Sequence, residues 1–309
     1  MRGAFAQTLV QLAEEDERVL LLTGDLGYMV LEPFAQRFPD RFFNVGVAEQ
    51  NMVGLASGLA EAGFIPFLYS IAPFAVLRPY EFIRNGPVMH GFQVRIAGVG
   101  GGFEYGHNGL THFGLEDVGV LRILPGMTVV APADHAQARN ALRSTWNMPG
   151  PVYYRLGKDD SVTVGGLDGR FELGRVQTLR EGRDLLMLAM GSIAIEAVEA
   201  ARRLTEQGVD CGVAVVAGIA PAPTADLAAI LARVPLAITV EEHFVNGGLG
   251  SLVSEVVAGH QLSCRVIRKG VEDLPRGISG SQAYLRRANG LSADALCETA
   301  LRALEKRRP

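Results

Sequence analysis

Short apolar runs of strand length alternate along the chain with longer segments in which apolar residues recur at helical spacing. Examples of these runs are residues 19–22, 94–99, 128–131, 185–189, 236–240 and 265–268. Regular alternation of predicted strands with predicted helices is typical of parallel sheets joined by helical crossovers. The pattern therefore predicts an α/β fold.

Several of the predicted strands run into a residue that can cap the following helix. Asp134 precedes an alanine-rich segment, Ser192 precedes residues 193–207, and Thr224 precedes residues 225–231. A side-chain oxygen at this position can accept a hydrogen bond from an amide of the first helical turn. We therefore expect helices to start directly after these three residues.

A polar, glycine-rich stretch separates two such α/β units. It extends from about residue 157 to residue 184 and contains GKDDSVTVGGLDG and LREGRD. Clusters of glycine and polar residues between periodic segments are typical of loops. We predict a first domain at 1–165, a linker at 166–183 and a second domain at 184–309, so that the fold class is two doubly wound α/β domains.

The composition is that of a soluble globular protein, and the charge distribution argues against one class of binding partner. Of the 309 residues, 48% are hydrophobic and 20% are charged, which allows for about two domains with real cores. The 29 basic and 33 acidic side chains give a net charge of −4, and they form no basic stripe that could follow a phosphate backbone. Nucleic acid is therefore not an expected partner.

The spacing of the cysteines and the length of the apolar runs indicate the cellular location of the protein. Cys211, Cys264 and Cys297 form no CxxC pair and the histidines are not clustered, which argues against a zinc site or a disulfide framework. No segment approaches the roughly 20 apolar residues of a membrane span, and the acidic residues at 14–17 do not suit a signal peptide. We expect a reducing, cytoplasmic location, no metal ligands in this chain and no membrane association.

Residues 45–63, VGVAEQNMVGLASGLAEAG, predict a strand end followed by a helix with Glu49 in its first turn. A carboxylate at this place can simply complement the helix dipole. The segment also resembles one found in transketolases and deoxyxylulose-phosphate synthases. In that family the glutamate bonds a ring nitrogen of the aminopyrimidine of thiamine diphosphate, and the helix lies at the subunit interface. The resemblance implies that Glu49 binds this cofactor.

A second matching segment is SIAPFAVLRPYEFIRN, residues 70–85, which includes the RxYE core of the family. In the family an aromatic ring from this stretch stacks on the pyrimidine. Phe74 falls at that place, and Ile71 and Leu77 fall where the family often has further aromatic residues. A lone phenylalanine after a strand is more often part of a core, so the cofactor contact of Phe74 is implied by the resemblance alone.

The most specific match is GHNGLTHFGLEDVGVLRILPGMTVVAPAD, residues 106–134. It resembles the family's glycine-rich loop that ends in Thr-His, followed by a strand that ends in Pro-x-Asp. His112 matches the histidine that contacts the reacting end of the sugar. His107 is expected nearby, and Asn108 stands where the family has an aspartate. The resemblance implies that His112 and Asn108 bind substrate, and His107, which has no matching family role, is added as a candidate because of its position.

Other matches extend the resemblance over nearly the whole chain. TGDLGYM, residues 23–29, resembles the family's Asp-Leu segment near the thiazolium, which implies that Asp25 lies beside the cofactor. Arg2 and Arg155 resemble arginines that bind the substrate phosphate. The second predicted domain resembles the family's C-terminal domain, which is usually a dimerisation and packing element.

One family segment is missing from this sequence. Transketolases hold magnesium and the cofactor's diphosphate through a Gly-Asp-Gly segment, and no Gly-Asp-Gly occurs here. Magnesium needs carboxylate and carbonyl oxygens as ligands. We therefore expect this chain to bind only the pyrimidine end of thiamine diphosphate, and to need a partner subunit that carries Gly-Asp-Gly and holds the magnesium ion, most simply in an α2β2 tetramer.

The implied reaction is transfer of a two-carbon ketol unit from a ketose, expected to be phosphorylated, to an aldehyde acceptor. Glu49 and His112 are the implied catalytic residues, with His112 placed for hydrogen bonding or proton transfer at substrate oxygens. Three alternatives stay open. They are an enzyme like deoxyxylulose-phosphate synthase, a 2-oxo-acid dehydrogenase β-subunit, which has Gly-x-x-His-Ser where this chain has GLTHF, and a scaffold subunit without catalysis.

Three departures from the family pattern concern the substrate. The family's phosphate-binding serine aligns with Met29, a histidine upstream of the loop aligns with Gly100, and the aspartate is Asn108. An asparagine can both donate and accept hydrogen bonds, whereas an ionised aspartate only accepts them. The sequence therefore predicts altered sugar recognition without identifying the sugar.

Overall fold

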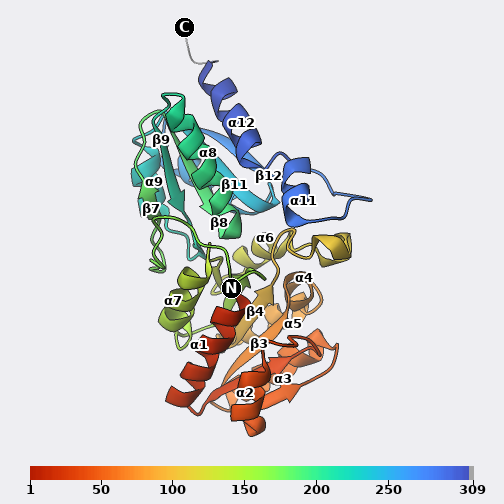
Figure 1. Cartoon of the computed structure of the whole chain (residues 1–309). Coiled ribbons are helices and arrows are strands. Elements are labelled where there is room, and N and C mark those ends of the chain that lie inside the picture. The colour runs from red at the N-terminus through yellow and green to blue at the C-terminus, as the bar shows by residue number, and fades with distance from the viewer. Residues whose placement is uncertain (306–309) are drawn as a thin grey trace.

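Two β-sheets, each covered by helices, form the framework of the computed structural model, which describes residues 1–305 (Figure 1). The first sheet has the strand order β10-β5-β6-β4-β3-β1-β2 and the second has the order β12-β11-β8-β9-β7. Strands of the first sheet are β1 (Val19–Thr23), β2 (Phe42–Asn44), β3 (Ile65–Ile71), β4 (Arg95–Val99), β5 (Thr128–Val130), β6 (Val152–Leu156) and β10 (Gly218–Ala220). Those of the second are β7 (Gln177–Arg180), β8 (Leu185–Met190), β9 (Cys211–Val215), β11 (Leu236–Phe244) and β12 (Arg265–Val271).

Nearly all strand pairs are parallel, as expected for strands separated by helices. The exceptions are two edge strands, since β10 runs antiparallel to β5 and β7 runs antiparallel to β9. All six of the apolar runs quoted above lie on strands, with bounds shifted by a few residues. The predicted α/β fold with two sheet domains is thus confirmed.

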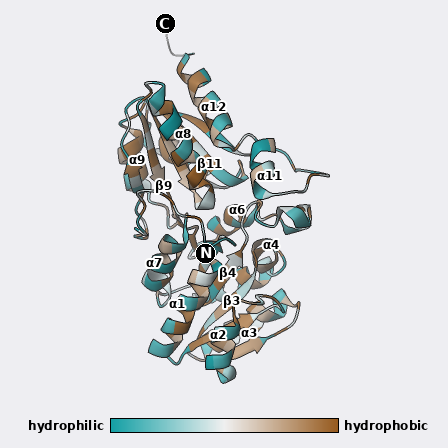
Figure 2. Cartoon of the chain, in the orientation of Figure 1, coloured by the Kyte–Doolittle hydropathy of each residue, from teal (hydrophilic) through white to brown (hydrophobic). Residues whose placement is uncertain are grey.

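Helices cover both faces of the first sheet because successive strand residues point to opposite sides. One face packs against α1 (Arg2–Glu15), α2 (Glu32–Arg37) and α7 (His135–Thr145). The other packs against α3 (Glu49–Glu61), α4 (Ala72–Val76), α5 (Tyr80–Ile83) and α6 (Asp117–Arg122). Figure 2 shows mostly apolar strands between helices that carry hydrophilic patches on their outer sides.

The second sheet is covered in the same way, and its core joins that of the first domain. One face packs against α8 (Ala194–Glu206) and α12 (Ala293–Glu305), with α11 (Gln282–Ala288) beside them. The other packs against α9 (Thr224–Leu231) and α10 (Leu249–Gly259), whose apolar residues belong to the same cluster as those of α3 and α6. The two domains therefore share a continuous core. No helix among residues 1–305 is long and apolar enough to cross a membrane.

The predicted helix caps are only partly right. Asp134 caps α7, because its carboxylate accepts a hydrogen bond from the amide of Gln137 at 2.8 Å. Ser192 does not cap α8, since it lies in a 3₁₀ turn before that helix and its hydroxyl donates to Glu104. Thr224 is the first residue of α9 and makes no capping hydrogen bond. Composition alone did not distinguish these positions.

The polar stretch predicted as a linker contains a strand. β7 lies within 166–183 and forms the edge of the second sheet, with β9 as its neighbour. An edge strand needs apolar packing on fewer sides, so its short sequence QTLR gave no clear strand pattern. Conversely, β10 comes from the part of the chain predicted to form the second domain, but it extends the first sheet beside β5.

Candidate active site

The candidate site lies at the carboxyl edge of the first sheet, where the loops that follow parallel strands come together. The loops after β1, β3, β4 and β6 meet there with the start of α3. Ligands of open α/β sheets generally bind outside this edge of the strands. The residues singled out by the sequence are mostly on these loops.

Glu49 is a buried carboxylate at the start of α3, with only 2% of the residue exposed. One of its oxygens accepts a hydrogen bond from the hydroxyl of Ser70, at the end of β3, at 3.2 Å. Both oxygens lie 3.0 Å from the same guanidinium nitrogen of Arg78. Because Arg78 is 41% exposed, this ion pair sits at the mouth of the site rather than in the core.

Phe74, Arg78 and His112 are stacked beside that carboxylate. The guanidinium of Arg78 lies over the Phe74 ring, 3.8 Å from its centroid. The His112 ring meets the same phenylalanine edge-on, with 5.0 Å between centroids. Burial lowers the pKa of His112, and the positive charge of Arg78 lowers it further. The structure therefore brings together Glu49, Phe74 and His112 and presents a neutral imidazole at pH 7.

Arg78 and Ser70 were not among the predicted site residues. Arg78 belongs to the RxYE segment and Ser70 stands at a strand end, which are the signals that could have pointed to them. Their contacts with Glu49 span 29 and 21 residues of sequence, so only the fold shows them.

Asp25 lies on the loop after β1, and the residue before it, Gly24, lies close to the Glu49 carboxylate. Its side chain is exposed, its φ is 58°, and its carboxylate accepts a hydrogen bond from Asn44 at 2.8 Å. The loop borders a cavity of about 210 Å³ that Leu26 and Tyr28 also line. A positive φ at a non-glycine residue is a strained conformation that often marks functional loops.

The other predicted cofactor and sugar residues surround the cluster without a hydrogen bond to it. Ile71 is half-buried at the end of β3, and Leu77 is 41% exposed after α4. His107 and Asn108 are exposed on a 3₁₀ turn at Gly106–Asn108, one turn before His112. Neither side chain makes a hydrogen bond or an ion pair within the described part of the chain, so both are available to bind a ligand.

The two predicted phosphate-binding arginines have different environments. Arg2, at the start of α1, lines an open cavity of about 560 Å³. Arg155 is buried, and its guanidinium donates to Asp117 at 2.9 Å, to the Gly114 carbonyl at 2.7 Å and to the Glu242 carbonyl at 2.9 Å. The cavity beside it measures about 10 Å³, room for about one water molecule. This placement does not support a phosphate contact for Arg155.

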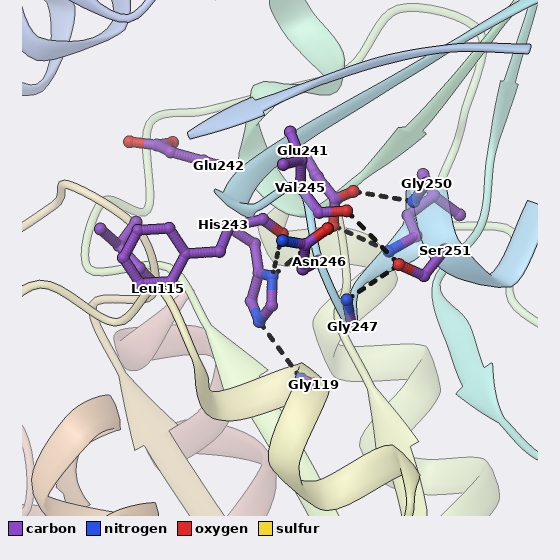
Figure 3. A network of polar contacts seen from close by, with 12 residues as sticks. Leu115, Gly119, Glu241, Glu242, His243, Val245, Asn246, Gly247, Gly250 and Ser251 are labelled. Carbon is purple, nitrogen blue, oxygen red and sulfur yellow. Dashed lines mark hydrogen bonds and ion pairs between the residues drawn. The ribbon is translucent and has the colours of Figure 1, made fainter. Parts of the chain in front are cut away.

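Arg155 is instead part of the joint between the domains, where the end of β11 meets the first domain. Figure 3 shows this end of β11, with the His243 ring directed at Gly119 of α6. The Glu242 carboxylate accepts from the amide of Phe103 at 2.9 Å and from Arg286 at 2.8 Å. His243 accepts from the amide of Gly119 at 3.2 Å. These contacts bracket residues 103–119, so the second domain fixes the loop that carries His112.

Breaking this joint at Arg155 is expected to destabilise the fold. Arg155→Met leaves the buried Asp117 carboxylate without its cation, and such a loss costs about 3–5 kcal/mol. We expect the free energy of unfolding in urea to fall by that amount. Arg183→Met, which breaks the exposed pair with Asp210, is the matched control and should show no measurable change. An unchanged unfolding curve for Arg155→Met would restore the prediction that Arg155 is an open anion ligand.

The described residues contain no metal site of their own. Within residues 1–305 no group of three or more His, Cys, Asp and Glu side chains could hold a metal ion. The three cysteines are buried thiols and form no disulfide in this part of the chain.

Comparison with known families matches both halves of the chain. The family described as "Transketolase, pyrimidine binding domain" matches residues 1–162, and "Transketolase, C-terminal domain" matches residues 174–296. Both matches extend into the polar stretch, and the second includes β7.

Individual relatives match over almost their full length. A "Putative transketolase C-terminal section" of Methanocaldococcus jannaschii is 35% identical over 99% of this chain and 96% of its own. An apulose-4-phosphate transketolase subunit of Phocaeicola vulgatus is 34% identical, covering 99% and 97%. A 6-deoxy-6-sulfo-D-fructose transketolase subunit of Clostridium sp. is 34% identical, covering 99% and 95%.

A solved structure agrees with these relatives. It is described as "Split gene transketolase, inactive beta4 tetramer", superposes with a TM-score of 0.90 at 36% identity, and covers 99% of both chains. The chain therefore belongs to the transketolase family, and it comprises the pyrimidine-binding domain followed by the C-terminal domain of that family.

Proposed function

We propose that this chain is the pyrimidine-binding subunit of a two-chain, thiamine diphosphate-dependent transketolase. The complex would transfer a two-carbon ketol unit from an anionic ketose to an aldehyde. The observation that carries this proposal is that one planar guanidinium, that of Arg78, both pairs with the buried Glu49 carboxylate and stacks on the Phe74 ring.

The contacts of Arg78 test whether an aminopyrimidine fits this place. A guanidinium is a planar group of N–H donors, and here it stacks on Phe74 while donating to Glu49. An aminopyrimidine needs the same two contacts, a stacking surface and a carboxylate partner. The residues therefore fit the group, provided that Arg78 moves aside, which its 41% exposure allows.

The side chains then have distinct roles. Glu49 would hold and exchange a proton with a ring nitrogen of the aminopyrimidine, and Phe74 would fix the plane of the ring. When bound, thiamine diphosphate supplies the carbon nucleophile that no protein side chain provides. His112, neutral at pH 7 because of the lowered pKa, would accept or donate a proton at the substrate's oxygens.

Substrate recognition is proposed for residues around His112. His107 and Asn108 would contact sugar hydroxyls, and Arg2 would contact the anionic end. Asp25 would border the far side of the cofactor, with Ile71 and Leu77 completing the apolar wall. The names of two relatives specify a phosphate and a sulfonate sugar, so an anionic ketose is the substrate class that the comparison supports.

The magnesium ion and the diphosphate are proposed to bind to a companion chain with a Gly-Asp-Gly segment, in an α2β2 tetramer. Support comes from the lack of that segment in this sequence and from relatives that are named as subunits. A cytoplasmic location is proposed as well, because the three cysteines are buried thiols outside any disulfide.

Reconstitution tests this function. We expect the purified chain alone to show no ketol transfer and weak binding of thiamine diphosphate by calorimetry, because half of the cofactor's ligands are absent. Addition of the companion chain and magnesium should produce activity and a mass that corresponds to two copies of each chain. Full turnover by the isolated chain would refute the two-chain proposal.

A further inference from the structure

The loop that carries His112 is closed at its base by a pair of glycines. Between β4 and α6, Gly102 and Gly114 exchange two backbone hydrogen bonds, at 2.8 and 3.0 Å. This pair closes a loop of residues 103–113, in which His112 is the next-to-last residue. The position of His112 therefore depends on what holds the two ends of this loop.

The apolar residues at the ends of the loop belong to the core of the second domain. Phe103, Phe113 and Leu115 are buried in the cluster formed by β8, β9, β11, α8 and α12. Phe113 follows His112 directly, and its ring meets that of Phe103 edge-on with 5.2 Å between the centroids. His112 itself contacts Phe74 of the first domain. The chain thus passes from one domain's core to the other's site within one residue.

Two residues at the end of β11 bond to the two ends of the loop. The Glu242 carboxylate accepts a hydrogen bond from the amide of Phe103 at 2.9 Å. The amide of Phe244 donates to the carbonyl of Leu115 at 2.9 Å. The base of the loop also packs against Glu242, because a Cβ atom at Gly102 would overlap its side chain. A strand of the second domain therefore holds the loop at its start and at its end.

His243, between these two residues, joins β11 to the helix that follows the loop. Its Nε2 atom accepts from the amide of Gly119 on α6 at 3.2 Å (Figure 3). Its Nδ1 atom lies 2.7 Å from the carbonyl oxygen of Phe244. An amide can only donate and a carbonyl can only accept. The ring is therefore the neutral tautomer with its proton on Nδ1.

The surroundings of His243 keep this ring neutral. The residue is 1% exposed, and burial lowers its pKa. The charges of Asp117 and Arg155 act on that pKa in opposite directions. Glu241 lies 3.7 Å from Nδ1, but its carboxylate accepts from two amides of α10. A neutral imidazole is the form that can accept from Gly119.

We propose that His243 is a positioning residue for ketol transfer, which holds the start of α6, and with it the His112 loop, against the end of β11. It does not touch the substrate. Its contact sets how closely the His112 ring approaches Phe74 and Arg78. The role of His112 in this inference rests on the proposed function. The second domain then contributes to the reaction, beyond the packing and dimerisation expected of it from the sequence.

Two amide variants separate the bond across the joint from the bond within β11. The carbonyl oxygen of glutamine lies as far along the side chain as Nε2 of histidine, whereas the oxygen and nitrogen of asparagine lie only as far as Nδ1. His243→Gln therefore keeps an acceptor for Gly119, and His243→Asn loses it. Thr239→Val is the matched control, because Thr239 is buried on the same strand and its hydroxyl has no hydrogen-bond partner among residues 1–305.

The reconstituted complex is assayed with xylulose 5-phosphate as donor. For His243→Asn we expect kcat to fall about tenfold, less than the roughly 100-fold that a misplacement of about 1 Å can cost, with KM nearly unchanged. His243→Gln and Thr239→Val should keep most of the wild-type kcat. An unchanged kcat in His243→Asn, or an equal loss in His243→Asn and His243→Gln, would overturn the proposal.

The pH profile gives a readout that a purely structural role of His243 would not move. Burial and the charge of Arg78 both lower the pKa of His112, and both effects weaken if the loop moves away from Arg78. The pKa of His112 should therefore rise toward 6.5 in His243→Asn. The acidic limb of kcat/KM should move to higher pH in that variant and stay in place in His243→Gln. A limb that does not move in His243→Asn contradicts the proposal.

An NMR titration of the His112 imidazole in the full chain tests the same shift without turnover. The His112 signal is assigned by its loss in His112→Gln. Its pKa should rise in His243→Asn and stay at the wild-type value in Thr239→Val. If His243→Asn does not fold, Gly119→Ala tests the contact from the first domain, because an added Cβ would lie 3.3 Å from the His243 ring and force the two apart.

The titration also separates the two proposals from each other. Gly119→Ala should raise the pKa of His112 in the same direction as His243→Asn, by a smaller amount. A His112 pKa that stays at the wild-type value in whichever of these two variants folds would overturn the role of His243. A complex without any turnover would refute the proposed function and leave this titration as the test of the positioning contact.

Discussion

Glu49→Gln is expected to lower kcat of the reconstituted complex by about 10²- to 10⁴-fold, the contribution typical of a positioned proton-transfer group. Glutamine has nearly the same shape as glutamate, so its carbonyl can still accept from Ser70 or from Arg78. It cannot exchange a proton with a ring nitrogen. Folding should be nearly unaffected, because the ion pair that is lost is half-open to solvent.

The matched control for this variant is Glu61→Gln, an exposed residue at the other end of α3. We expect Glu61→Gln to keep wild-type kcat, and both variants to assemble with the companion chain and unfold near the wild-type temperature. Near-normal turnover by Glu49→Gln would remove the carboxylate from the mechanism. It would also favour the alternative of a scaffold subunit whose partner does the chemistry.

His112→Gln is the variant with the second largest expected effect, a decrease in kcat/KM of about 10²-fold or more. The wild-type complex should also lose kcat/KM at acidic pH. Burial and the charge of Arg78 hold the pKa of His112 below its usual 6.5, so the imidazole is neutral above that pH and becomes protonated only as the pH falls below it. The acidic limb of the pH profile should therefore lie below pH 6.5.

A profile of kcat/KM from pH 5 to pH 8 checks this expectation. The limb should disappear in His112→Gln and remain in His260→Gln, a control at an exposed histidine after α10. A limb that persists in His112→Gln would assign the titration to another group, and His112 would then be only a packing partner of Phe74.

How much of the site the sequence could predict depends on how far apart in the sequence the contacting residues are. Glu49, Phe74 and His112 belong to motifs of fixed local spacing, and the fold brings these three together. The contact of Arg78 with Glu49 needs the start of α3 to lie beside the segment between α4 and α5, which no local pattern specifies.

Arg155 shows the opposite error, in which a motif match pointed to a role that the surroundings do not support. Its partners Asp117 and Glu242 lie 38 and 87 residues away, and the second comes from the other domain. The same dependence on tertiary context affected the edge strands. Five of the six apolar runs lie on buried strands and the sixth lies on the edge strand β12, whereas the edge strands β7 and β10 carry too few apolar residues to be distinguished from loop.

The position of β10 has a consequence for synthesis of the chain. Until residue 220 is made, β5 is the outer strand of the first sheet and its free backbone groups face solvent. Ribosomes add about 5–20 residues per second, so roughly 3–13 s separate completion of β6 at Leu156 from completion of β10 at Ala220. During that interval the nascent domain exposes an open edge of the kind that pairs with other chains. The first sheet is complete only when residues 218–220, from the second domain's part of the sequence, have been made.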